Sequence, residues 1–481
     1  MSLSRRVPAL LAASALSVTA LSLTALAAGA APIASLSPPP ADQALGRALL
    51  KELIEIDTQH ASGSTVAANA VAARLRAAGF ADADIAVLAP ADHPTKGNVV
   101  VRLHGQGKAR PILYICHLDV VNARREDWTT DPFKLVEKDG WYYGRGTIDM
   151  KSQDAATLES LIRLKREGFK PKGDIIVAFT ADEEAGGDAN GVDWLVKTHR
   201  DLVDAALVIN PDGGEAGVKH GKKLYLGVQT SEKVYVTYGL EVTDKGGHSS
   251  RPTPANPIFR LSRALGRLSA YRFPVHVTDT VKLYFAGRAK LESGQMAADM
   301  VSMAGAAPDP AAVERLSDIV ETNILFRTTC TATEISGGHA ESALPQRARA
   351  TIQCRVIPGE PLDGIKAQLA QALADPSIRI TDVSPGAASP ESPPAPRLLK
   401  TIETVKNGMW PEAVLLPTMS AGASDSAFTR LGGMPSYGVD ASWDDLDDGR
   451  AHGQDERIGV QVFDEEVEFT YRLMKALASG Q

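Results

Sequence analysis

Six short polar segments, spread along the chain, most constrain what it can fold into. Each of them ends an apolar run or opens a turn, where a strand delivers side chains to one edge of a sheet. Carboxylate and imidazole groups in these segments are ligand types that zinc accepts at neutral pH. They belong to His117, Asp119, Asp149, Glu183, Glu184, Asp212, His248 and His452. One segment alone would mean little, but all six in this order predict a site for two metal ions.

Between these segments, short apolar runs alternate with stretches of helical spacing. The sequence predicts strands at 98–103, 111–116, 174–180 and 205–209, and helices at 43–57, 64–78, 154–166 and 192–199. The strand runs are apolar throughout, as expected for strands buried on both faces. This alternation predicts an α/β fold with a mostly parallel sheet flanked by helices.

A different pattern begins near Lys223. The segments 225–228 and 234–243 alternate apolar and polar residues, which is typical of antiparallel strands with one solvated face. Further strands are expected at 323–335 and 347–356, and helices at 256–268 and 362–373, whereas 296–310 fits no element. We therefore predict an inserted α+β domain at 223–384, a Pro-rich linker to 396, and an α/β domain made of 41–222 and 396–481.

The N-terminal residues are typical of an export signal. Arg5 and Arg6 precede an uncharged stretch at 7–28, and Ala-x-Ala patterns at 25–27 and 28–30 offer cleavage sites. The alternative is an uncleaved anchor, because the stretch is long enough to span a bilayer. Its many Ala, Ser and Thr residues favour cleavage, so residues 1–30 are predicted to be a signal peptide. The expected location is periplasmic or secreted, without membrane attachment after cleavage.

Composition and cysteine usage narrow the range of partners. The 481 residues carry a net charge of -7 and only 5% aromatic residues, without a basic stripe, which argues against nucleic acid. The odd count of three cysteines argues against a disulfide scaffold, and Cys116 lies in an apolar run typical of a buried thiol. A hairpin near Ser342 would bring Cys330 and Cys354 opposite each other, where an oxidising compartment allows a bridge.

The first three polar groups have both a metal-binding and a purely structural interpretation. Asp119 can hold the His117 imidazole in the tautomer that binds metal, although a buried His–Asp pair would look the same. Asp149 follows a glycine turn and could bridge two metal ions with its two oxygens, or cap the next helix.

The glutamate pair is the most informative of the six segments. Glu183 and Glu184 directly follow a strongly apolar strand, where solvated acids are seldom found. One can bind metal while the other accepts a proton from the attacking water. Asp212 follows the next strand, with Asn210 and Glu215 as competing ligands and a plain turn residue as the alternative.

The last two histidines lie in loops. His452 precedes the final helix in a polar loop and is either a ligand or a surface residue. His248 lies within the inserted domain, where it could stabilise an oxyanion. The alternative for His248 is a loop residue that caps the following helix.

Taken together, these motifs resemble the dizinc metallopeptidase family of carboxypeptidase G, aminoacylase-1, carnosinase and succinyl-diaminopimelate desuccinylase. The resemblance runs from Gln43 to Ala478 and implies a zinc-exopeptidase type of fold with an inserted lid or dimerisation domain. It implies Glu183 as the catalytic base and a cis peptide after Asp149. The implied ligands are Asp149, Glu184 and His452 for one ion, and Asp149, His117 and Asp212 for the other.

The resemblance also implies further site residues outside the ligand set. In this family the lid often dimerises and lends its histidine, here His248, to the partner's site. Arg355 resembles the arginine that grips the substrate carboxylate, although Gln353 stands where the family often has Asp. Asp212 likewise stands where near relatives usually carry Glu. The loop that binds the same carboxylate is matched by Gly422, Ser424 and Asp425.

These features predict a zinc-dependent metallo-exopeptidase of the carboxypeptidase kind, which cleaves the amide bond to a C-terminal amino acid in small peptides. Two Zn²⁺ ions are the expected cofactors, with Co²⁺ or Mn²⁺ as substitutes, and a homodimer through the lid is the expected assembly. Some segments are similar to Gly-X carboxypeptidases and to N-acyl-amino-acid hydrolases. The alternative function is therefore an N-acyl-amino-acid amidohydrolase. A non-catalytic peptide-binding protein is the third hypothesis, against which the intact glutamate pair argues.

Overall fold

The computed structural model describes residues 35–185, 189–384, 386, 388–393 and 395–480. The predicted signal peptide at 1–30 lies outside the described residues. Within them, no helix combines the length and apolar character needed to cross a lipid bilayer.

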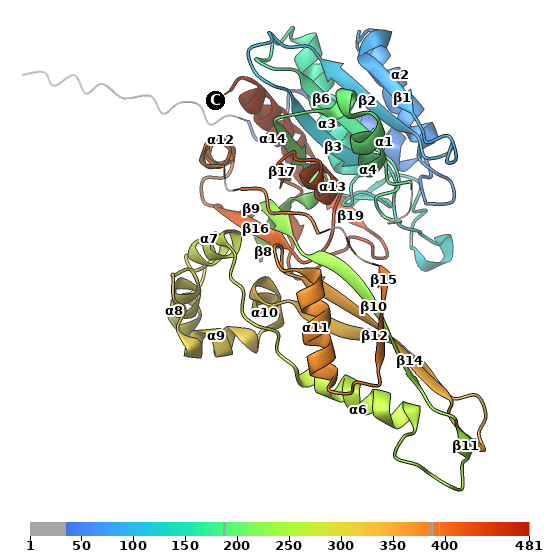
Figure 1. Ribbon diagram of the computed structural model, residues 1–481. Coiled ribbons are helices and arrows are strands. Elements are labelled where there is room, and N and C mark those ends of the chain that lie inside the picture. The colour runs from blue at the N-terminus through green and yellow to red at the C-terminus, as the bar shows by residue number, and fades with distance from the viewer. Residues whose placement is uncertain (1–34, 186–188, 385, 387, 394, 481) are drawn as a thin grey trace, which may run out of the picture. The chain divides into compact units, whose positions relative to one another are not determined.

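Ten strands of the described residues form one large sheet (Figure 1). Its order is β1–β2–β6–β3–β7–β17–β9–β8–β18, with β16 also paired to β9. The central strands β6, β3, β7 and β17 run parallel, while the outer pairs β1–β2 and β9–β8 are antiparallel. The strands are β1 (Ile85–Leu88), β2 (Asn98–Leu103), β3 (Ile112–His117), β6 (Ile175–Thr180), β7 (Leu207–Asn210), β8 (Glu215–Lys219), β9 (Lys222–Glu232), β16 (Val414–Ser420), β17 (Ser436–Gly438) and β18 (Asp444–Asp445). The predicted α/β fold with a mostly parallel central sheet is confirmed.

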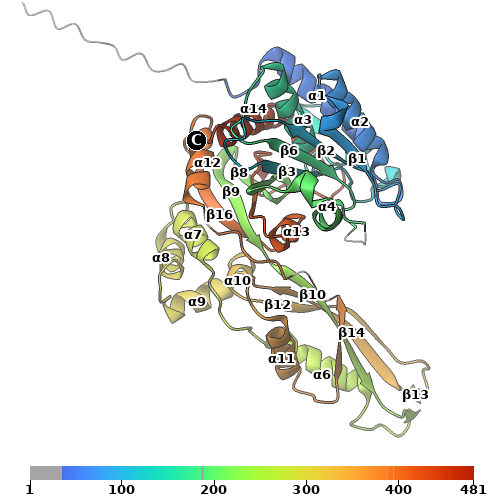
Figure 2. The same ribbon diagram turned by 45° about the horizontal axis from the view of Figure 1, so that its top comes forward.

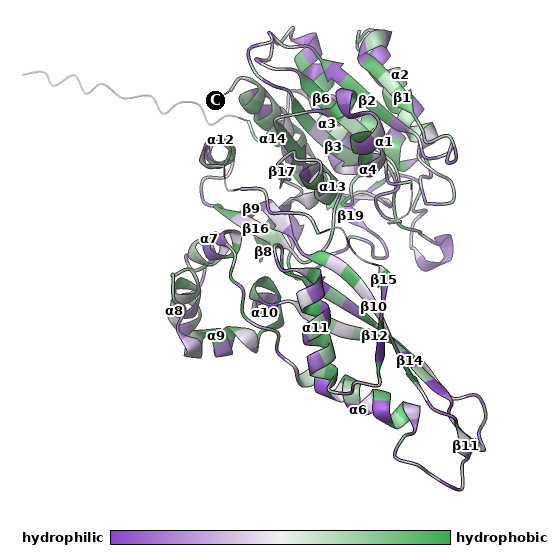
Figure 3. Cartoon of the chain, in the orientation of Figure 1, coloured by the Kyte–Doolittle hydropathy of each residue, from purple (hydrophilic) through white to green (hydrophobic). Residues whose placement is uncertain are grey.

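Helices cover both faces of this sheet. Tyr114 and Cys116 of β3 belong to one apolar cluster, and the alternating Leu113 and Ile115 belong to another. Figure 3 shows the resulting apolar character of β3 and β6. Two buried faces explain why these strands are continuous apolar runs. The first cluster involves α1 (Pro40–Ile54), α2 (Thr65–Ala77), α3 (Lys151–Arg166), α12 (Pro396–Asn407) and α14 (Val460–Ala478), and the second involves α4 (Gly191–Thr198), α5 (Arg200–Val203) and α13 (Ser426–Leu431).

A second, antiparallel sheet has the order β12–β14–β10–β15. Burial alternates along β14, because one face packs on α6 and α11 and the other is solvated, as the sequence predicts. The remaining strands form two small sheets, with the orders β11–β13 and β19–β5–β4. The elements are β10 (Val234–Thr243), β12 (Thr329–Gly337), β14 (Arg347–Val356), β15 (Arg379–Ser384), β11 (Gly247–His248), β13 (Ala343–Leu344), β4 (Val136–Lys138), β5 (Trp141–Tyr143), β19 (Arg457–Gly459), α6 (Pro257–Ala270) and α11 (Leu362–Leu373).

The structure differs from the sequence prediction in two places. Strand β9 belongs to the large sheet, so the change from one sheet to the other falls at Lys233 rather than near Lys223. The predicted strand at 323–335 is wrong over its first residues, which form the end of helix α10 (Val320–Phe326). Periodicity alone cannot decide whether a short apolar run such as Ile324–Phe326 forms a helix or a strand.

Residues 279–326 form four helices, including the stretch at 296–310 that fitted no element. They are α7 (Asp279–Arg288), α8 (Gly294–Met303), α9 (Pro310–Ser317) and α10. Phe285, Met300 and Phe326 share one apolar cluster with Met419 of β16. Figure 2 shows α7 beside β16, which it contacts directly.

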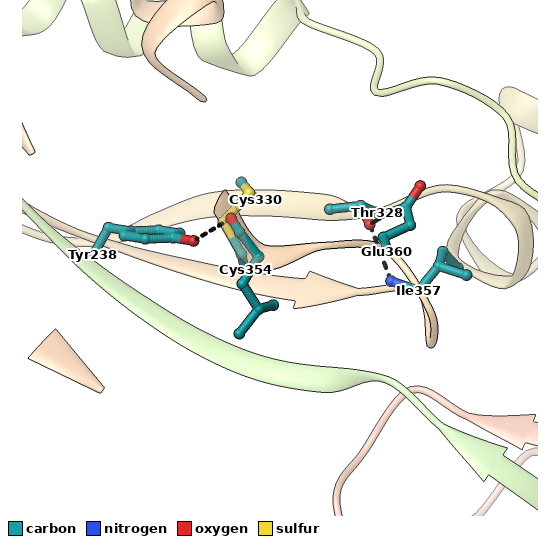
Figure 4. The surroundings of a disulfide bond; sticks show 7 residues. Tyr238, Thr328, Cys330, Cys354, Ile357 and Glu360 are labelled. Atoms are coloured by element: carbon teal, nitrogen blue, oxygen red, sulfur yellow. Dashed lines mark hydrogen bonds between the residues drawn. A yellow bond between two sulfur atoms is a disulfide. The ribbon is translucent and has the colours of Figure 1, made fainter. Parts of the chain in front are cut away.

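The disulfide joins directly opposite residues of β12 and β14. Cys330 and Cys354 are cross-strand partners, as the hairpin interpretation requires, and their sulfur atoms are bonded (Figure 4). Close by, the Thr328 hydroxyl donates to Glu360 and accepts the backbone N–H of Ile357 at 3.0 Å. Cys116 is a buried free thiol, as predicted.

Candidate metal centre

Three neighbouring parallel strands deliver most of the predicted ligands to one edge of the large sheet. β3 ends at His117, β6 is followed by the Asp182–Glu184 turn, and β7 leads into a 3₁₀ turn that carries Asp212. Parallel strands point their carboxyl ends to the same edge, so these polar groups meet there. His452 comes from the loop before β19 and reaches the same edge.

The five predicted ligands form two groups that share Asp149. Nε2 of His117 lies 3.1 Å from Oδ1 of Asp149 and 3.9 Å from Oδ1 of Asp212. Nε2 of His452 lies 2.9 Å from Oδ2 of Asp149 and 3.0 Å from Oε1 of Glu184. Within each group the donor atoms lie within 4.8 Å of one another. Each oxygen of Asp149 therefore faces a different group, as a bridging carboxylate requires.

The electrostatics of the two groups fit a pair of cations. Burial and then the neighbouring Asp212 raise the pKa of Glu183 well above its usual value in the metal-free site. Burial lowers the pKa of His117, but hydrogen bonds to Asp149 and Asp212 outweigh it, so that pKa is raised well above 6.5. Hydrogen bonds to Asp149 and Glu184 raise the pKa of His452 to about 10. Divalent metal ions would replace these protons, and the oxygen and nitrogen donors suit Zn²⁺, Co²⁺ or Mn²⁺.

Asp119 contacts both the His117 imidazole and the glutamate pair. Nδ1 of His117 lies 3.0 Å from the backbone carbonyl oxygen of Asp119, whereas the nearest carboxylate oxygen is 3.8 Å away. The carboxylate instead accepts the backbone N–H groups of Glu183 and Glu184, both at 3.1 Å. The carbonyl thus orients the imidazole, and the carboxylate positions the glutamate pair.

A buried ion pair, which the sequence did not reveal, supports the same turn. Asp182 has a φ of 64°, a conformation that is unusual for a residue other than glycine. Its Oδ1 accepts from Nζ of Lys96 at 2.5 Å and lies 2.7 Å from Nδ1 of His60. The acid beside the glutamate pair was visible in the sequence, but its partners come from a distant segment.

A second buried pair joins the loop of Asp149 to the loop of His452. The Glu456 carboxylate accepts Nη1 of Arg145 at 2.5 Å and backbone N–H groups of Gly146, Ile148 and Asp149 at 2.7–3.1 Å. Nη2 of Arg145 donates to the carbonyls of His452 and Gly453. The turn itself needs glycine, because Gly146 has a φ of 90°. The cis peptide between Asp149 and Met150 is present, as the resemblance implies.

Two further predicted site residues lie outside both ligand groups. His248 is exposed on β11, where its Nδ1 lies 2.8 Å from the Ser250 hydroxyl. Arg355 lies on β14, with its guanidinium 4.8 Å from the centre of the Tyr235 ring. Neither side chain belongs to the two candidate ligand groups found among the described residues.

The loop after β16 separates into a surface part and an interior part. Gly422 is exposed, and Ser424 donates to Glu232 at 2.8 Å. Asp425 is buried and accepts Nδ2 of Asn190 at 2.6 Å, and burial raises its pKa to about 7. Ser424 lines a pocket of about 700 Å³ that also reaches Asp212. The loop therefore adjoins the metal centre, with the Asp425 carboxylate turned to the interior.

The competing ligands to Asp212 have other partners. Nδ2 of Asn210 donates to the hydroxyl of Ser426 at 3.0 Å, and Glu215 accepts the hydroxyl of Tyr225. Neither belongs to the candidate metal groups of the described residues, whereas Asp212 does.

An α/β sheet whose strand ends gather two overlapping ligand sets defines a class: the dinuclear metal-dependent hydrolases. Solved structures share this fold. A M20 family metallo-carboxypeptidase from Sulfolobus solfataricus matches with a TM-score of 0.63 and 17% identity, over 90% of this chain and 99% of that chain. Human carnosine dipeptidase 1 matches with a TM-score of 0.59 and 16% identity, over 91% of this chain and 97% of that chain.

The family model described as Peptidase family M20/M25/M40 matches residues 113–476, and the chain belongs to this family of metal-dependent hydrolytic enzymes. The human N-fatty-acyl-amino acid synthase/hydrolase PM20D1 is 27% identical over 394 residues, which cover 77% of this chain and 75% of that protein. Probable carboxypeptidase S-like 2 of Dictyostelium discoideum is 28% identical over 380 residues, which cover 76% and 71%.

Proposed function

We propose that the protein is a zinc-dependent exopeptidase of the carboxypeptidase kind, which hydrolyses the amide bond to the C-terminal amino acid of small peptides. The observation that carries this proposal is the shared Asp149, whose two oxygens face the His117 group and the His452 group. The relative named carboxypeptidase S-like supports the peptidase activity.

In the proposed mechanism, Glu183 is the general base. Bound metal ions in such sites polarise the scissile carbonyl and lower the pKa of water toward about 7. Glu183 lies outside both ligand groups, and Asp119 holds its backbone N–H. Its carboxylate is therefore free to accept a proton from the attacking water and return it to the leaving amine.

Hydrolysis of N-acyl amino acids is the second candidate function. It is favoured by the relatives named N-fatty-acyl-amino acid synthase/hydrolase. The reaction uses the same ligands and the same base, because the bond is again an amide to an amino acid with a free carboxylate. Zinc is the proposed metal in both cases, with Co²⁺ or Mn²⁺ as substitutes.

Substrate binding is proposed to involve a lid and a second subunit. The lid is proposed to span 223–384, inserted between catalytic segments 41–222 and 396–481, and its own antiparallel sheet begins at Val234 because β9 pairs within the large sheet. His248 is exposed and would reach the site of the partner subunit, where it would stabilise the oxyanion. Arg355 and Gly422 would hold the substrate carboxylate, Ser424 would line the substrate pocket, and the buried Asp425 would support their loop. Export through a signal peptide at 1–30 is supported by the disulfide, which is typical of oxidising compartments.

Substitution of the two glutamates tests the proposed roles. Glu183→Ala should keep two equivalents of zinc and lower kcat by about 10²–10⁴-fold, the usual contribution of a general base. Glu184→Ala should lose metal as well as activity, because its Oε1 faces His452. Metal content is measured by plasma mass spectrometry, and turnover with a panel of dipeptides and N-acyl amino acids. Full activity in both variants would contradict the mechanism.

A further inference from the structure

The pocket beside Asp212 has a wall built by the helical segment 279–326. Tyr284 of α7 and Ile324 and Leu325 of α10 line it, together with Met419 of β16. Its volume of about 700 Å³ lies within the range of small-molecule sites, roughly 300–1,000 Å³. The pocket therefore has room for a large group directly beside the candidate metal centre.

This wall is fixed to the sheet that carries the metal ligands. A Cβ atom at Gly287 of α7 would lie 2.3 Å from Cδ2 of Leu416, so the helix packs closely on β16. The hydroxyls of Thr280 and Thr230 lie 2.6 Å apart and join the start of α7 to β9. Figures 1 and 2 both show α7 next to β16. The pocket is thus preformed relative to the metal centre.

The charges around the pocket disfavour an anionic ligand. Arg288 is already paired with Glu292, with Nη2 and Oε1 2.8 Å apart. Glu215 and Glu321 also line the pocket, next to the ligand Asp212. The free carboxylate of the substrate would meet these acids, and the described lining residues include no cation besides the paired Arg288, so an uncharged group fits better here.

We propose that this pocket binds the acyl side of the scissile amide, and that α7 and α10 select large, uncharged, apolar acyl groups. The inference rests on the proposed amide hydrolysis and names the part of the substrate that this wall selects. Ile324 is the residue that tests it, because it is half-buried in the pocket wall and lies outside the apolar cluster of the four helices.

The experiment measures kcat/KM of the zinc-loaded enzyme for N-acetyl-, N-hexanoyl-, N-decanoyl- and N-succinyl-alanine. In the wild type we expect at least about 10-fold higher kcat/KM for decanoyl than for acetyl, and a lower value for succinyl than for hexanoyl. Ile324→Trp fills the pocket and should lower the decanoyl-to-acetyl ratio by about 10-fold. Val320→Trp is the matched control on the same helix, because Val320 is 70% exposed, and it should keep the wild-type ratio.

Ile324→Ser provides a second variant that removes apolar contact without adding bulk, and it should also lower the ratio. An unchanged ratio in both Ile324 variants, or a wild type that prefers succinyl, would overturn this inference alone. A zinc-loaded wild type that hydrolyses neither these amides nor dipeptides would overturn the proposed function and the inference with it.

Discussion

At the residue scale, the main finding is that the backbone and the side chain of Asp119 position different groups of the site. Its backbone carbonyl orients the His117 ring, while its carboxylate holds the amides of Glu183 and Glu184. Both hydrogen bonds are charge-assisted, which makes them stronger than bonds between neutral groups. The base and one ligand are therefore positioned by the same side chain.

Asp119→Asn separates these two tasks. The amide side chain can accept only one of the two N–H bonds, so we expect kcat to fall by about 10- to 100-fold, as for other supporting residues of metal sites. Metal content should stay at two equivalents, because the carbonyl still orients His117. Steady-state kinetics and metal analysis check this. Loss of one metal ion with an unchanged rate per loaded site would instead show that the Asp119 carboxylate orients the His117 imidazole.

At the element scale, helix α3 contains a buried acid without a hydrogen-bond partner among the described residues. Glu159 is fully buried, and both carboxylate oxygens are unpartnered. Burial, and then the nearby Asp42, raise its pKa to about 8. The folded state therefore favours the neutral form of this side chain.

Glu159→Gln should change the pH dependence of stability. In the wild type the unfolded chain ionises near pH 4.5 but the folded chain only near 8, so stability falls as pH rises through that window. The variant removes this loss. We expect the free energy of unfolding of the variant to exceed that of the wild type by about 1 kcal/mol at pH 5 and by about 4–5 kcal/mol at pH 8.5. Urea unfolding at pH 5 and pH 8.5 measures the free energy of unfolding of the wild type and the variant. Glu403→Gln, at an exposed position, is the control. An equal change in the free energy of unfolding at both pH values would contradict the raised pKa of Glu159.

The strands that could be predicted from the sequence are those whose order of apolar and polar residues follows directly from which faces are buried. The apolar runs of β2, β3 and β6 are buried on both faces, and the alternation in β10 and β14 reflects one solvated face. The helices at 279–326 are short and bury apolar residues against one another and against β16, so local periodicity did not identify them.

Most candidate ligands were predictable for a similar reason, because they end or follow an apolar strand or a glycine turn, whereas His452 lies in a polar loop. Their supporting partners were not. Lys96 for Asp182, Asn190 for Asp425 and Glu456 for Arg145 come from segments far away in the chain, and only the folded structure brings them together.

At the scale of the whole molecule, the metal centre joins segments from most of the chain, because its ligands run from His117 to His452. Loading metal should therefore stabilise the entire fold. Treatment with a chelator at pH 8 should lower Tm, by an amount that corresponds to about 2.7 kcal/mol when free zinc is at 100 times its Kd. Differential scanning calorimetry with and without chelator measures this. An unchanged Tm would show that the ions add nothing to folding.

The same experiment at pH 6 should give a smaller difference in Tm. The metal-free folded protein holds protons on His117 and His452, whose pKa values are raised by their carboxylate neighbours. Metal ions must displace these protons, so metal affinity falls as pH falls.

The shared carboxylate of Asp149 links the occupancies of the two positions. Arrival of the first ion fixes the orientation of the side chain, which favours the second, while the charge of the first ion opposes it. Neither affinity is therefore independent of the other. A sample given one equivalent of zinc will consist of a mixture of states, and the curve of activity against added equivalents will show whether half-loaded molecules accumulate or are skipped.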